Sequence, residues 1–115
     1  MIFYNGQQKE AVFMVKKELL ALWDFIENCL RLALNECRST LPSEDADEVI
    51  EEIDYNEFLL ALYPLTLYFV DNKIKFSKIA SKYIREAAIA MEINKESNDD
   101  YWLWEKIEPL LTDER

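Results

Sequence analysis

The sequence of 115 residues contains no histidine and only one glycine, Gly6. Histidine is the commonest general base and metal ligand, so its absence excludes Ser-His and Cys-His hydrolytic triads and histidine-containing zinc sites. A single glycine excludes the glycine-rich phosphate loops of dinucleotide-binding and P-loop proteins, which need several. We therefore expect no enzyme, no cofactor and no bound metal.

Basic residues are absent from the middle of the chain. Between Ser39 and Asn72 there are nine acids and no lysine or arginine. The ninth is Asp71, and the first eight form a segment that we call the acidic block: Glu44, Asp45, Asp47, Glu48, Glu51, Glu52, Asp54 and Glu57. Because like charges this dense destabilise the helix that carries them, the block calls for an explanation.

Long hydrophobic runs and cysteines are also scarce. The longest uncharged apolar run, residues 58–70, contains Pro64 and falls short of the roughly 20 residues of a membrane span, so we expect core. Cys29 and Cys37 lie about 12 Å apart on one predicted helix, too far for a disulfide. Both should pack as small apolar residues, as in a reducing cytoplasm. The N-terminus shows no signal-peptide pattern.

The remaining composition is typical of a compact helical domain. Half of the residues are hydrophobic although the net charge is -10, and glycine is too rare for many tight turns. We predict one all-α domain over residues 1–115, a compact bundle of four to five helices. The predicted helices lie near 7–38, 44–63, 65–71, 74–94 and 98–112. If Pro64 only kinks the second helix, the count is four.

Apolar spacing predicts which helix faces turn inward. The first helix, with a predicted cap at Asn5, has an apolar stripe from Val12 to Cys37 that should face the core throughout. The second, capped by Ser43, places apolar residues on one face and the acidic block opposite; these apolar residues are Ala46, Val49, Ile50 and Ile53. Pro109 should kink or shorten the last helix, for which Ser97 is the predicted cap.

The acidic block has two explanations, which the sequence leaves open. Acids four residues apart, such as Glu44 and Glu48 or Asp47 and Glu51, each cost a helix about 0.2–0.5 kcal/mol. A basic partner could offset this repulsion. Alternatively, the 74–94 helix could neutralise the block from within, through Lys78, Lys82 and Arg85.

Residues 53–59 resemble the end of an EF-hand calcium loop. The first half of such a loop is missing, since Ile50 stands at a ligand position and Glu51 at the position of the required glycine. We therefore do not expect calcium binding. The basic residues from Lys73 to Arg85 are not expected to bind nucleic acid, because the net charge of -10 opposes it.

Two tryptophans near the C-terminus complete the predicted surface. Trp102 and Trp104 are two residues apart, so they point to different sides of a helix and one should be exposed. An exposed tryptophan beside an acidic rim is a common interface anchor. The predicted partner-binding residues are Glu44, Asp47, Glu48, Glu51, Glu52, Asp54, Glu57, Trp102 and Trp104.

These features favour an inhibitory binding protein with a basic protein partner, located in the cytoplasm, that binds neither nucleic acid nor membranes. In size, acidity and lack of catalytic groups the chain is similar to the helical immunity proteins of bacteriocin and contact-dependent toxin systems. That resemblance implies a bacterial immunity protein or antitoxin that covers the basic active site of a nuclease toxin. The alternatives are a phage-type DNA mimic (anti-restriction or anti-CRISPR) and a helical subunit of a larger assembly. The oligomeric state stays open.

Overall fold

The computed structural model describes residues 6–113, with side chains from residue 16 onward. It contains five α-helices and one 3-10 turn: α1 Gly6–Cys37, α2 Ser43–Asp54, α3 Phe58–Asp71, α4 Lys78–Ala90, α5 Tyr101–Ile107 and the turn η1 Glu108–Leu110. The all-α prediction is confirmed. The predicted cap Asn5 lies outside the described residues. No helix in the described part combines the length and hydrophobicity needed to cross a membrane.

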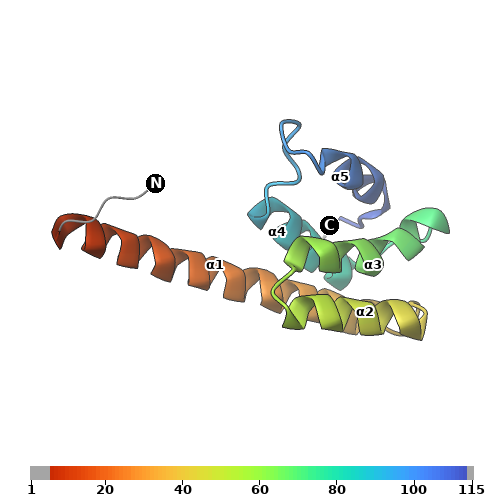
Figure 1. Cartoon of the computed structure of the whole chain (residues 1–115). Helices are drawn as coiled ribbons and strands as arrows, with labels where there is room; N and C mark the ends of the chain where they lie inside the picture. The colour runs from red at the N-terminus through yellow and green to blue at the C-terminus, as the bar shows by residue number, and fades with distance from the viewer. Residues whose placement is uncertain (1–5, 114–115) are drawn as a thin grey trace.

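Helix α3 is the central element of the core. It has no charged residue before its last position, Asp71, and a helix that is apolar on all sides must be covered on several of them. It packs against α2, α1 and α5 (Figure 1). Its one buried polar side chain, Thr66, donates a 2.7 Å hydrogen bond to the carbonyl of Leu62. The prediction that residues 58–70 form core is confirmed.

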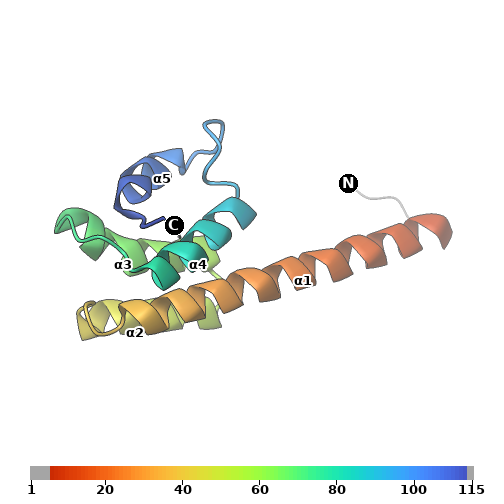
Figure 2. The same cartoon turned by 180° about the vertical axis from the view of Figure 1, so that it is seen from behind.

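The second half of α1 packs mainly against α4 (Figure 2). Cys29 and Cys37 are free and buried, as predicted. The Cys29 thiol lies 3.7 Å from a carboxylate oxygen of Glu86 in α4. Burial, with a further contribution from Glu86, raises the pKa of Cys29 to about 11, and burial raises the pKa of Cys37 to about 12. Both side chains therefore stay neutral at physiological pH.

The first part of α1 projects beyond the other helices, as both overall views show (Figures 1 and 2). Every residue from 16 to 25 is exposed, and the first buried residue of the described part of α1 is Ile26. The prediction of a core-facing stripe along the whole helix is wrong here: Leu19 and Leu22 are each 41% exposed. At about 1.5 Å per residue the helix is about 48 Å long. This length approaches the molecule's longest dimension, 54 Å, and the burial that begins at Ile26 shows that the other helices cover only the second half of α1.

The chain breaks between α2 and α3 at residues 55–57, not at Pro64 as predicted. Asn56 adopts a left-handed conformation with φ 59°. Its N–H donates to the carbonyl of Ile53, and the N–H of Glu57 donates to that of Glu52, both at 2.9 Å. This is the Schellman ending of a helix, for which asparagine is suited. Pro64 lies inside α3 and has no N–H to donate to the carbonyl of Leu60, four residues earlier. Leu60 is 49% exposed, so water is close to this carbonyl.

Two further helices end in the same way. Lys73 after α3 and Glu92 after α4 have φ values of 54° and 64°. The next residues, Ile74 and Ile93, close the motif with hydrogen bonds back to the carbonyls of Phe69 and Ala88. All three left-handed positions in the described residues are thus held by asparagine, lysine or glutamate, although glycine tolerates this conformation best.

The termini of the other helices are close to their predicted places. Helix α2 has Pro42 at its N-cap position and Ser43 as its first residue, so the predicted Ser43 cap is one position off. Helix α4 starts after Ser77, whose hydroxyl accepts a hydrogen bond from the N–H of Ala80. Helix α5 starts after Asp100, not Ser97. Pro109 lies in η1 and shortens this last helix, as predicted.

We predict that Lys73→Gly stabilises the protein. The left-handed conformation costs a non-glycine residue about 1–2 kcal/mol. The greater flexibility of glycine in the unfolded chain cancels about 0.5–1 kcal/mol of that gain. The free energy of unfolding, measured by urea titration with circular dichroism, should rise by about 0.5–1 kcal/mol.

Lys82→Gly provides the matched control, because Lys82 is an exposed lysine in the helical conformation inside α4. Glycine there should lower the free energy of unfolding by about 1 kcal/mol. Equal losses in the two variants would contradict the role assigned to Lys73.

Candidate partner-binding site

Helix α2 turns its acidic side to solvent. Ala46, Val49 and Ile53 are buried against the core and Ile50 is half-buried, which confirms the predicted apolar face. Most of the acidic block is exposed: Glu44, Asp47, Glu48, Glu51, Asp54 and Glu57. Asp45 and Glu52 are half-buried. The predicted acidic residues therefore lie together along one side of α2 and the loop that follows it.

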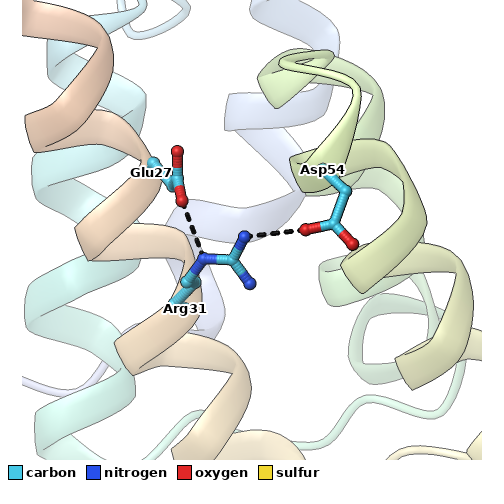
Figure 3. A network of polar contacts seen from close by, with 3 residues as sticks. All are labelled: Glu27, Arg31 and Asp54. Atoms are coloured by element: carbon cyan, nitrogen blue, oxygen red, sulfur yellow. Dashed lines mark hydrogen bonds and ion pairs between the residues drawn. The ribbon is translucent and has the colours of Figure 1, made fainter.

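Arg31 of α1 forms ion pairs at the C-terminal end of this acidic surface (Figure 3). Its guanidinium donates to Glu27 and to Asp54 at 2.9 Å each, which joins α1 to α2. Asp54 is the last residue of α2, where the partial negative charge of the helix terminus disfavours an acid. The hydrogen bonds to Asp54 and Glu27 raise the pKa of Arg31 above its ordinary value, so the guanidinium stays charged.

The cations of α4 have other neighbours. Arg85 lies 3.9 Å from Asp113, and the ammonium of Lys82 lies 5.4 Å from the ring centre of Tyr83. Two of the three cations that were considered as internal counter-charges are thus engaged away from α2. One cation that reaches the acidic block is Arg31, which the sequence did not single out, and it pairs with Asp54 at the C-terminal end of α2.

A cleft of about 290 Å³ lies between α2 and α3. We call it the acidic cleft, and its lining residues are Asp45, Glu48, Tyr63, Pro64, Leu67, Tyr68 and Asp71. Three carboxylates thus surround a floor made of two phenol rings and apolar side chains. This cleft was not predicted from the sequence, although its lining residues in α3 have the spacing of one helix face. The strong hydrophobicity of residues 58–70 concealed that spacing.

Trp102 stands beside the acidic cleft. Its ring centre lies 5.7 Å from that of Tyr63, with an interplanar angle of 34°. The Tyr63 hydroxyl donates a 2.7 Å hydrogen bond to Asp100, and this bond, together with burial, raises the pKa of Tyr63 to about 12. Trp102 is 42% exposed, as expected for one of the two tryptophans. Trp104 is only 7% exposed, so its predicted role in partner binding is wrong: it faces the core beside Leu103.

This arrangement is suited to a cationic side chain. Carboxylates attract a guanidinium or ammonium group, and aromatic faces add cation–π attraction. The arginine stem can also lie along apolar surface. Within the described residues, no group of three histidine, cysteine or acidic side chains is placed to hold a metal ion. Comparison of the chain with known protein families, characterised proteins and solved structures finds no match.

We predict that Arg31→Ala lowers the free energy of unfolding by about 0.5–1 kcal/mol, because the pairs are partly exposed and such pairs contribute little. The loss should shrink in high salt, which screens the charges. Urea titrations at low and high salt measure both effects.

Lys95→Ala is the control for this prediction. Lys95 pairs with Glu92 within a single turn and connects no two helices. Its removal should cost less than that of Arg31. An equal loss in the two variants would show that the Arg31–Asp54 ion pair between α1 and α2 stabilises the protein no more than a pair within one turn.

Proposed function

We propose that this chain is an acidic inhibitory binding protein of the bacterial immunity-protein or antitoxin class. In this proposal it neutralises a nuclease toxin by covering the toxin's basic active site. The observation that supports it is the exposed acidic side of α2, where Arg31 offsets one carboxylate at the end of the helix.

A nuclease active site presents lysine and arginine to the phosphates of its substrate. An opposing acidic surface accelerates association by electrostatic steering and suppresses unsuitable partners. The repulsion among the acids of α2 would be relieved in such a complex. Binding of a basic protein thus explains a charge pattern that costs the free protein stability.

The acidic cleft supplies the specific contact in this proposal. An arginine or lysine of the toxin would enter between Asp45, Glu48 and Asp71, with its stem against the Tyr63 and Tyr68 rings. Trp102, exposed and packed on Tyr63, would extend the contact beyond the cleft. Aromatic residues around a desolvated charge pair are typical of the strongest interface contacts.

The test is capture of partners from the native host at low salt, elution by a salt gradient and mass spectrometry, followed by a nuclease assay of the captured protein. The double variant Glu48→Lys with Glu51→Lys should weaken binding by roughly tenfold to a hundredfold. Both side chains are exposed, so the helical circular dichroism signal should stay unchanged. The wild-type protein should inhibit the captured nuclease, and the variant should not.

The charge-matched control is Glu36→Lys with Glu96→Lys, two exposed acids outside α2 and α5. It changes the net charge equally and should keep the affinity. Equal weakening in both variants would mean that net charge, not this surface, controls binding. Capture of a host restriction or CRISPR nuclease would instead favour the phage-type DNA mimic, and a captured protein without nuclease activity would refute the proposal.

A further inference from the structure

The projecting part of α1, residues 6–25, is a helix that we call the arm, and every residue of it from 16 onward is exposed. Five large apolar side chains in its described part are 40% to 47% exposed: Leu19, Leu20, Leu22, Trp23 and Phe25. Singly exposed apolar residues are ordinary, but five within seven positions mark an interaction surface. Most of the stability of helices in proteins comes from packing of an amphipathic face, and the exposed residues of the arm lack such packing in the single chain.

The arm carries the same stripe that α1 buries in the core. At 100° per residue, Leu19, Leu22 and Trp23 fall on the face of Ile26, the first buried residue of the described part of the helix. Val12 and Val15 continue that face in the sequence. The spacing is the a and d pattern of a coiled coil, which a second helix can fill.

The distribution of charge favours a second copy of this chain as the partner. The arm carries three lysines and three acids, so the whole net charge of -10 belongs to the rest of the chain. Two copies would therefore repel one another through most of their surface but not through the arm. A strongly basic partner would find no net charge to attract it here.

The order of charges along the arm selects the relative direction of the two helices. Residues 6–17 contain Lys9, Lys16 and Lys17 against one acid, whereas the charged residues of 18–25 are the two acids Glu18 and Asp24. Antiparallel arms bring the basic half of one beside the acidic half of the other. Parallel arms would align like charges.

We propose that two copies of this protein form an antiparallel dimer through their arms, with the twofold axis near Leu20 and Ala21. Leu19 of each copy then packs against the partner's Leu22. About this axis residue 16 of one arm lies beside residue 25 of the other, so ten residues of each arm pair, about 15 Å of helix. The acidic cleft lies on α2 and α3, so this interface leaves it free in both copies.

Sedimentation velocity over a range of concentrations tests the dimer. The wild type should dimerise, and the dimer should persist in 1 M salt because the seam is apolar. Leu19→Glu with Leu22→Glu should raise the dissociation constant by about a hundredfold or more. At a protein concentration low enough for the wild type to be monomeric, the variant should keep the wild-type urea midpoint, because both leucines lie outside the core.

Leu20→Glu is the matched control. Leu20 is the most exposed of these residues at 47% but lies about 100° from Leu19 around the helix, off the stripe. This variant should still dimerise. A monomeric wild type, or a dimer unaffected by the double variant, would overturn the proposal. If that monomer binds vesicles of phosphatidylcholine and phosphatidylglycerol, lipid covers the arm instead, which also overturns it.

Cross-linking tests the direction of the arms. Leu19→Cys and Leu22→Cys chains, mixed and oxidised, should form mainly a 19–22 heterodimer if the arms are antiparallel. Self-linked 19–19 and 22–22 products would show parallel arms and overturn the proposed geometry. The native cysteines should not interfere, since Cys29 and Cys37 are buried in the core.

Discussion

The burial of α3 is the constraint on which the rest of the structure depends. A helix that is apolar on nearly every side must be surrounded, and α2, α1 and α5 surround it. Each covering helix can offer only its own apolar face, so its polar residues are turned outward. The outward direction of the acids of α2 is thus a consequence of core packing, and no interaction among the acids themselves is needed to achieve it.

Repulsion among the acids of α2 determines how much stability this acidic surface removes. The acidic residues of α2 repel one another along the helix, and the described ion pair that reaches them, from Arg31, lies at the C-terminal end. Most of the exposed carboxylates remain hydrated, and hydration limits the repulsion. A free protein can therefore keep this helix folded, because the apolar face of α2 contributes more stability than the charges remove.

Amphipathic periodicity explains what could be predicted from the sequence. The inward face of α2, the buried cysteines and the core run of α3 follow from spacing and composition alone. The break between α2 and α3 was placed at Pro64 because proline opposes helix continuation, yet the left-handed Asn56 ended the helix earlier. Such a local ending depends on how the next helix packs, which spacing does not reveal.

Contacts between residues of different helices were harder to predict than the inward face of each helix. The acidic cleft joins residues of two helices, and its floor was hidden in a segment whose hydrophobicity indicated only core. The arm is exposed because α1 extends beyond the helices that cover its second half. Local spacing in the sequence does not reveal how far that cover reaches. The burial of Trp104 in place of Trp102 likewise depends on how α5 rotates against its neighbours, because both residues are equally apolar.

The packing of α1 on α4 has a consequence for the order of folding. Helices α2 and α3 are joined by three residues, so their pairing needs only a short loop to close. Cys29 and Glu86, by contrast, meet across 57 positions of the chain. Closing that larger loop costs more conformational entropy, so the contacts of α2 with α3 can form while α1 is still undocked. We therefore expect the pairing of α2 with α3 to form before the packing of α1 on α4.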